Sequence, residues 1–141
     1  MKKGKLTSAI ITFNEEKDIA RCLEHLKWAD EILIVDSFSE DRTVDICRKY
    51  TDKIYQHKWP GFGPQRNYAL HLVDTEWVLF VDADEVVPKE LAEEIIEAIN
   101  NQKFEGYEIP RRNYFLGKPL RFSDQYNKII RLFNNSAFFA F

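Results

Sequence analysis

The stretch WVLFVDADEVVP, residues 77–88, joins the pattern of a buried strand to a cluster of acidic side chains. Its first five residues are apolar, and the carboxylates Asp82, Asp84 and Glu85 follow within four positions. Two carboxylates about 4 Å apart repel each other by roughly 4 kcal/mol at an effective dielectric constant near 20. An ordered cluster of this kind therefore needs a cation or hydrogen-bond donors between its members.

Composition indicates one globular domain with an acidic body. The chain has 141 residues, of which 45% are hydrophobic and 14% aromatic, enough to form a core. Residues 1–102 carry 13 basic and 20 acidic side chains, whereas residues 103–141 carry 7 and 3. A nucleic-acid-binding protein needs a basic surface to neutralise phosphates, so the acidic body argues against nucleic acid as a partner.

The chain shows no membrane-spanning or secretory pattern. No apolar stretch approaches the ~20 residues of a transmembrane helix, and the N-terminal segment turns acidic before a signal peptide would be complete. We expect a cytoplasmic location, with peripheral contact to the inner face of the membrane left open. Cys22 and Cys47 fall on apolar positions of expected helices, which favours reduced buried thiols over a disulfide or a metal-ligand pair.

Short apolar runs alternate with helical periodicity along the first two thirds of the chain. Strands are expected at residues 6–13, 31–36, 53–56 and 77–82. Helices are expected at residues 14–26 with Asn14 as N-cap, 42–50 with Asp41 as N-cap, 65–73, and 88–100 with Pro88 in the first turn. This alternation is typical of an α/β fold built from parallel β-α units.

From residue 106 the pattern changes to strands and turns interrupted by glycine and proline. We therefore expect residues 1–105 to form an α/β ligand-binding part and residues 106–141 to begin a β-rich part of the same domain. The last residues, SAFFAF, bring three phenylalanines to the end of the sequence. We interpret them as belonging to a longer protein or as packing on a partner.

Polar side chains follow the expected strands where each strand ends, namely Asn14 and Glu15, Asp36, and Asp82 with Asp84. In an open parallel sheet, ligands bind beyond the carboxyl ends of the strands. Asp82 and Asp84 are two positions apart, so they face the same side of an extended segment and can share Mg²⁺ or Mn²⁺. The alternative is an acidic turn that precedes the next helix.

Several ordered motifs carry a resemblance that spans essentially the whole chain. They are ITFNEEKDIARCL (11–23), ADEILIVDSFSEDRTVDI (29–46), WPGFGPQRNYAL (59–70), WVLFVDADEVV (77–87), RRNYFLG (111–117) and IIRLF (129–133). This series resembles the family 2 glycosyltransferases of the GT-A fold, in particular bacterial lipopolysaccharide-core β-1,4-glucosyltransferases. The resemblance implies a mainly parallel sheet with helices on both faces. It also implies metal-assisted, inverting sugar transfer from a nucleotide-diphosphate donor, a UDP-sugar, to a hydroxyl of a cell-envelope glycan or a lipid-linked acceptor.

The resemblance further implies which residues bind the donor and the metal. The donor-binding set comprises Thr12, Phe13, Asn14, Glu15, Asp36, Ser37, Gln65, Arg66, Asn67, Asp82 and Ala83. Asp82 and Asp84 would hold the cation on the diphosphate. Relatives often carry an aspartate shortly before the RLF triplet, where this chain has Asn127, so Asp124 is the candidate catalytic base.

Alternatives remain for several of these residues. Asp36 can instead cap the helix expected at residues 42–50, and Arg66 can be a solvated helix charge. Phe38 stands where the family usually has glycine, and its ring either crowds the nucleotide or stacks on it. The basic residues Arg111, Arg112, Lys118 and Arg121 fit a phosphorylated or lipid-linked acceptor, or the protection of an edge strand.

Two other functions are also compatible with the sequence. A haloacid-dehalogenase-type phosphatase also places D-x-D after an apolar strand, although there the motif normally opens the chain. A fragment that binds a nucleotide-sugar without transferring it is the stronger alternative. The sequence predicts no oligomeric state.

Overall fold

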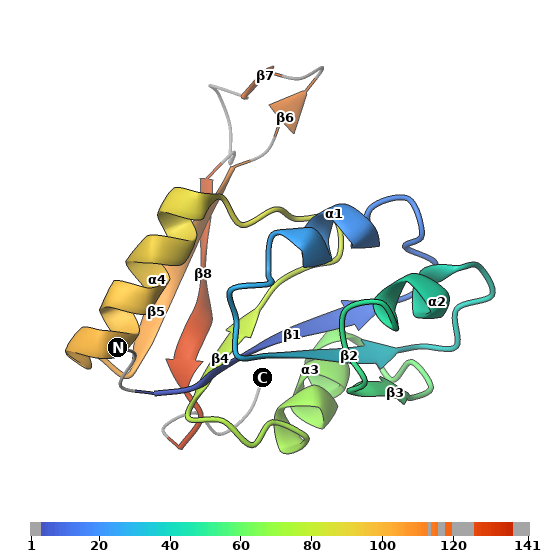
Figure 1. Cartoon of the computed structure of the whole chain (residues 1–141), viewed down its shortest axis with the longest axis horizontal. Helices are drawn as coiled ribbons and strands as arrows, with labels where there is room; N and C mark the ends of the chain where they lie inside the picture. The colour runs from blue at the N-terminus through green and yellow to red at the C-terminus, as the bar shows by residue number, and fades with distance from the viewer. Residues whose placement is uncertain (1–3, 113, 116–117, 120–125, 137–141) are drawn as a thin grey trace.

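The computed structural model describes residues 4–112, 114–115, 118–119 and 126–136, which build a six-stranded sheet with helices on both faces (Figure 1). The strand order is β3-β2-β1-β4-β8-β5. The strands are β1 (Leu6–Thr12), β2 (Glu31–Asp36), β3 (Ile54–Gln56), β4 (Trp77–Phe80), β5 (Gly106–Arg112) and β8 (Tyr126–Asn134). A separate hairpin pairs β6 (Tyr114–Phe115) with β7 (Lys118–Pro119).

The sheet is parallel across its first four strands and antiparallel beyond them. β1 pairs in parallel with both β2 and β4, and β2 with β3, whereas β8 runs antiparallel to β4 and to β5. Thr12 is in register with Asp36, so β1 and β2 end side by side. The carboxyl ends of β1, β2, β3 and β4 therefore meet at one edge of the sheet, as expected for parallel β-α units.

Three helices cover one face of the sheet and one helix covers the other. α1 (Ile19–Glu24), α2 (Thr43–Cys47) and α4 (Lys89–Asn101) pack in one cluster, with strand residues such as Ile10 and Ile34. α3 (Phe62–His71) packs in a second cluster, with Ala9, Leu33 and Val35. Because alternate residues of β1 and β2 enter opposite clusters, these strands are buried almost throughout. No helix among the described residues is long and apolar enough to cross a membrane.

The first expected helix is the main error in the predicted elements. α1 begins at Ile19, after Asp18, and Asn14 is not its N-cap. Asn14 instead has a φ of +50°, a left-handed conformation that asparagine tolerates better than most residues. α3 begins earlier than expected, inside the glycine-proline loop, where Gly61 precedes it with a φ of +114° that favours glycine. α4 starts one residue after Pro88, close to the expected position.

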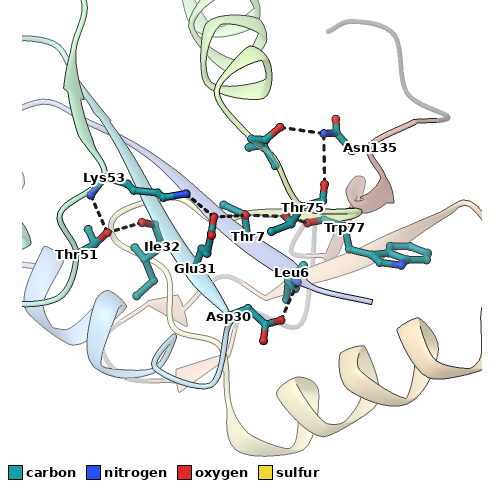
Figure 2. A network of polar contacts seen from close by, with 11 residues as sticks. Leu6, Thr7, Asp30, Glu31, Ile32, Thr51, Lys53, Thr75, Trp77 and Asn135 are labelled. Atoms are coloured by element: carbon teal, nitrogen blue, oxygen red, sulfur yellow. Dashed lines mark hydrogen bonds and ion pairs between the residues drawn. The ribbon is translucent and has the colours of Figure 1, made fainter. Parts of the chain in front are cut away.

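Polar contacts fasten the opposite edge of the sheet, where the parallel strands begin (Figure 2). The Thr7 and Thr75 hydroxyls lie 2.7 Å apart, and Thr7 also donates to the Glu31 carboxylate at 3.4 Å. Lys53 pairs with that carboxylate at 2.8 Å. On the far side, the Asn135 side chain donates to the Thr75 carbonyl at 3.4 Å. These bonds link the segments around β1, β2, β3, β4 and β8, leaving the other edge available for loops that bind a ligand.

Candidate functional site

The acidic turn after β4 lies between arginines from two different elements. Glu85 accepts a hydrogen bond from the Asp82 backbone N–H at 2.8 Å, and the Glu85 N–H donates to the Asp82 carbonyl at 2.9 Å. Arg131 of β8 pairs with the Glu85 carboxylate and lies 3.4 Å from Asp82 Oδ2. Arg66 of α3 lies 3.5 Å from Asp82 Oδ1. Guanidinium groups thus supply the positive charge that this carboxylate cluster requires.

Asp36, at the end of β2, is completely buried and accepts four hydrogen bonds. Its Oδ1 accepts from the hydroxyls of Thr12 at 2.7 Å and Ser39 at 2.6 Å. Its Oδ2 accepts from the Ser39 N–H at 2.8 Å and from Gln56 Nε2 at 3.5 Å. Asp36 therefore organises the loop after β2, and it does not cap α2. The carboxylate at the start of α2 is that of Asp41, which accepts from the Thr43 N–H at 2.9 Å.

The loop after β1 is fastened to the loop after β2. The Asn14 N–H donates to the Ser39 hydroxyl at 2.8 Å, and the Asn14 side-chain carbonyl accepts from the Glu40 N–H at 2.9 Å. The Glu15 N–H donates to the Thr43 hydroxyl at 2.8 Å. The two loops thus hold each other in one conformation, and the left-handed backbone of Asn14 keeps it out of α1.

Gln65, in the first turns of α3, joins that helix to the ends of β2 and β3. It is fully buried, and its Nε2 donates to the Ser37 hydroxyl at 3.0 Å and to the His57 carbonyl at 3.3 Å. Its Oε1 lies 2.8 Å from His57 Nδ1, and the His57 ring stacks on Tyr68 with centroids 3.8 Å apart. His57 therefore takes part in loop packing, and Gln65 and Ser37 form one buried contact.

Two aromatic rings stand exposed beside these loops. Phe13 follows β1 and is 54% exposed, and Phe38 follows β2 and is 55% exposed. Phe38 has a φ of +58°, the left-handed region that favours glycine. The backbone here keeps the conformation suited to the glycine that the family usually has, although a bulky residue occupies the position.

The remaining expected site residues differ in their surroundings. Asp84 is exposed, and no hydrogen bond or ion pair engages its carboxylate among the described residues. Ala83 is buried in the core with α1 and α4. Asn67 is half-buried on α3, and its carbonyl lies 2.7 Å from His71 Nδ1. Asp124, the candidate base, lies outside the described residues.

Nearby negative charges act on two groups beside the turn. Partial burial raises the pKa of Glu15, and the charges of Asp84, Asp18, Asp41 and Asp82 raise it further. Burial raises the pKa of Cys22 to about 12, with added effect from Glu85, Asp84 and Asp82. Burial is the larger cause of both shifts, and the charges of the turn after β4 add to it.

The side chains of the turn fit a cation that is shared with a ligand. Carboxylates and phosphates are the ligands that Mg²⁺ prefers, and one or two carboxylates with substrate phosphates are a common set. Among the described residues no group of three or more His, Cys, Asp or Glu side chains is arranged to hold a metal ion. Asp82 and Asp84 alone suit a metal held partly by a bound diphosphate.

Arg131 is the functional candidate that the sequence motifs did not single out. Its side chain is only 10% exposed, and it lies in the otherwise apolar run IIRLF. A charged residue inside a buried strand requires a partner, so an arginine at this position indicates a buried ion pair. Its partners could not be read from the sequence because β8 pairs with β4 across about fifty residues.

A cavity of about 580 Å³ lies at the opposite edge of the sheet. Residues around the start of β4 and the end of β8 line it, including Thr75, Trp77 and Asn134. None of the expected site residues contributes to its wall. We therefore assign the candidate site to the loops at the carboxyl ends of β1, β2, β3 and β4.

The chain is similar to known proteins over most of its length. The family model described as "Glycosyl transferase family 2" matches residues 7–138. The chain is 33% identical to the lipopolysaccharide core biosynthesis glycosyltransferase LpsC of Rhizobium meliloti over 121 residues, which cover 82% of this chain and 45% of LpsC. The chain spans about half the length of the curated relatives it matches.

Solved structures share the fold. TarS of S. aureus in complex with UDP-GlcNAc superimposes with a TM-score of 0.64 and 28% identity, covering 84% of this chain and 37% of TarS. A mannosyltransferase of Pyrobaculum calidifontis in complex with GDP-Man and Mn²⁺ gives a TM-score of 0.64 and 20% identity, covering 79% of this chain and 36% of that one. These likenesses confirm the α/β GT-A fold expected from the motifs.

Proposed function

The chain belongs to glycosyl transferase family 2, and we propose that it binds a nucleotide-diphosphate sugar, a UDP-sugar, for transfer to a hydroxyl acceptor. The observation that carries this proposal is the Asp82–Asp84 turn, which lies beside Arg66 at the edge where the parallel strands end. The UDP-GlcNAc complex of TarS supports the donor class. Family membership argues against the phosphatase interpretation.

The loops after β1 and β2 and the start of α3 are the proposed walls of the donor site. Thr12 to Glu15, with Asp36 and Ser37, would surround the base and ribose, and the exposed Phe13 offers a ring for stacking. The Asp36 carboxylate already accepts four hydrogen bonds. Its proposed contact with the nucleotide therefore requires the exchange of one of these donors, and the weakest is the 3.5 Å bond from Gln56.

The diphosphate is proposed to lie between α3 and the acidic turn. Arg66 is 28% exposed and is suited to a phosphate, because its planar guanidinium matches phosphate oxygens. Gln65 fixes this turn of α3 through Ser37, Asn67 completes the proposed donor wall, and the core residue Ala83 would meet the donor only through its backbone. Asp82 and Asp84 would hold Mg²⁺ or Mn²⁺, which when bound stabilises the negative charge that develops on a leaving diphosphate.

The acceptor side is proposed to begin with residues 106–141, after a donor-binding part at residues 1–105. Inverting transfer needs a base for the acceptor hydroxyl, and Asp124 is our candidate for that role. The similarity to LpsC supports a lipopolysaccharide or another cell-envelope glycan as acceptor. A lipid-linked acceptor of this class would bring the protein to the cytoplasmic face of the membrane.

The test is a thermal-shift experiment with Mn²⁺ and UDP, added separately and together. Each ligand supplies contacts that the other lacks, so the combined shift should exceed the sum of the single shifts. Asp84→Asn should remove most of this synergy. Asp52→Asn, which changes an exposed carboxylate in the connection between β2 and β3, is the matched control and should retain it. Strictly additive shifts in the parent chain would refute the proposed metal-diphosphate site.

A second measurement separates binding from transfer. Released UDP is measured to detect hydrolysis of UDP-sugars without acceptor glycans and transfer in their presence. Binding without acceptor-dependent release would support the alternative, in which residues 1–141 bind the donor but do not transfer it. Acceptor-dependent release that is lost in Asp124→Asn would support transfer and would assign the base.

A further inference from the structure

Arg131 and Glu85 form a partly buried ion pair beside the proposed metal ligands, and neither of them is assigned to ligand binding. Resting on the proposed function, we propose that this pair is a clamp that positions the Asp82–Asp84 turn for a divalent cation and a diphosphate. Arg131 belongs to β8, which is antiparallel to the four strands whose ends form the site. The clamp thus brings a positioning residue from outside the β-α units.

The geometry shows how the clamp acts on Asp82. Glu85 accepts the Asp82 N–H at 2.8 Å, and Asp82 accepts the Glu85 N–H through its carbonyl at 2.9 Å. These two bonds close the turn in both directions. Arg131 holds the Glu85 carboxylate and also reaches Asp82 Oδ2 at 3.4 Å. The backbone and one carboxylate oxygen of Asp82 are therefore fixed by a single pair of side chains.

Burial separates the clamp from the residues that face a ligand. The side chains of Arg131 and Glu85 are 10% and 19% exposed, compared with 37% for Asp82. Arg131 Nη1 also approaches the Phe80 carbonyl at 3.5 Å, which ties the guanidinium to the end of β4. Glu85 is thus engaged with Arg131 and the turn, while the more exposed Asp82 and Asp84 are placed to meet a cation.

The two arginines on Asp82 differ in exposure, at 10% for Arg131 and 28% for Arg66. Arg131 is held by Glu85 and by the Phe80 carbonyl. Arg66 is 28% exposed, and its guanidinium lies over the Phe62 ring at 5.9 Å. Because a cation must approach one Asp82 oxygen, Arg66 is the partner suited to leave Oδ1, while Arg131 keeps its hold on Oδ2. The clamp therefore determines that Oδ1 of Asp82, and not Oδ2, faces the cation.

Charge-conserving variants test the clamp, because removal of a charge would itself alter cation affinity. Arg131→Lys keeps the positive charge but loses the planar fork that reaches both carboxylates. Glu85→Asp keeps the negative charge but shortens the arm that reaches the Asp82 N–H. Each variant should bind Mn²⁺ in the presence of UDP about 10- to 100-fold more weakly than the parent chain, the range for losing a residue that orients metal ligands.

The matched control is Arg48→Lys just after α2, where the arginine is 67% exposed and pairs with Asp45. It makes the same substitution away from the site and should leave Mn²⁺ affinity unchanged. Affinity is measured by calorimetry, and folding by circular dichroism, at a temperature well below every melting midpoint. A purely structural role would lower the melting temperature of Arg131→Lys and leave the Mn²⁺ affinity of the folded protein unaltered.

The outcomes separate this inference from the proposed function. If the parent chain shows no metal-dependent UDP binding, the proposed function fails first. If the parent chain binds Mn²⁺ with UDP, and the folded variants Arg131→Lys and Glu85→Asp bind it within twofold of the parent, the clamp is refuted while the proposed function stands. The double variant should bind little more weakly than the weaker single variant, since both changes break one unit, whereas fully multiplied losses would contradict a shared clamp. If Arg131→Lys does not fold, Glu85→Asp decides the question.

Discussion

The Thr12 hydroxyl lies 2.7 Å from Oδ1 of Asp36, and both residues are buried where two adjacent parallel strands end. Asp36 also accepts bonds from Ser39 and Gln56, so it connects β1, β2 and β3 at the proposed donor site. Asp36→Ala should lower the free energy of unfolding by about 3 kcal/mol, because it leaves buried donors without an acceptor. Urea unfolding followed by circular dichroism measures this loss.

The same variant should weaken nucleotide binding by about 1 to 3 kcal/mol in calorimetry, because the loops that would hold the nucleotide lose their common acceptor. Asp52→Ala, at an exposed carboxylate near the start of β3, is the control and should change neither quantity. Unaltered stability in Asp36→Ala would contradict the four-bond geometry. Lowered stability with unaltered UDP affinity would instead show that Asp36 stabilises the fold and takes no part in donor binding.

Phe38 should be a source of backbone strain at the proposed donor site. A residue other than glycine costs roughly 1 to 2 kcal/mol in a left-handed conformation, and the φ of Phe38 is +58°. Phe38→Gly should therefore be more stable than Phe38→Ala by about 1 kcal/mol, since both variants lose the ring and only glycine relieves the strain. Denaturant unfolding of the two variants checks this difference. Equal stability would mean that the loop adopts another conformation in solution.

The ring of Phe38 is tested by the same pair of variants. If the ring stacks on the bound nucleotide, both substitutions should weaken UDP binding by about 1 to 3 kcal/mol. If it only crowds the loop, both should bind UDP at least as well as the parent chain. The two interpretations of this departure from the family pattern therefore give opposite signs in one calorimetric experiment.

The parallel strands and their ends could be predicted because their signals are local. The runs expected at residues 6–13 and 31–36 became β1 (Leu6–Thr12) and β2 (Glu31–Asp36), since both enter apolar clusters on the two faces of the sheet. The helix expected from Asn14 failed for a non-local reason. The N–H groups of Asn14 and Glu15 bond to the side chains of Ser39 and Thr43, more than twenty residues away.

The positions of the candidate carboxylates in the fold could be predicted. The carboxylates Asp36, Asp82 and Asp84 follow apolar runs and lie at strand ends, which periodicity and strand position indicate. The groups that hold them could not be predicted. Arg131 reaches Asp82 only because β8 pairs with β4, and an antiparallel return of this kind leaves no periodic signal in the intervening sequence.

The two cysteines should be unreactive in the folded protein. Burial raises the pKa of Cys22 to about 12, and burial with the nearby charge of Asp36 raises that of Cys47 to about 12. At pH 8 only about one thiol in 10⁴ is then a reactive thiolate. Ellman's reagent should label neither cysteine before unfolding and both in urea. Rapid labelling of the native protein would contradict the packing of α1 and α2.

The raised pKa of Glu15 gives stability a specific pH dependence. Burial comes first among its causes, followed by the charges of Asp84, Asp18, Asp41 and Asp82. The folded state therefore binds the Glu15 proton more readily than the unfolded state, whose pKa is near the ordinary 4.5. The contribution of Glu15 to stability is then greatest below pH 4.5 and falls as pH rises through the raised value.

Glu15→Gln removes this penalty, so the variant should be more stable than the parent chain at pH 7 and lose that advantage near pH 4. Urea unfolding across pH 4 to 7 measures the difference between the two proteins at each pH. Glu40→Gln, at an exposed position in the facing loop, is the control for the loss of one negative charge. The Glu15 variant should gain more stability than this control with rising pH, because its carboxylate is partly buried and lies near the charges of Asp84 and Asp18. A difference that does not vary with pH would contradict a raised pKa of Glu15 in the folded protein.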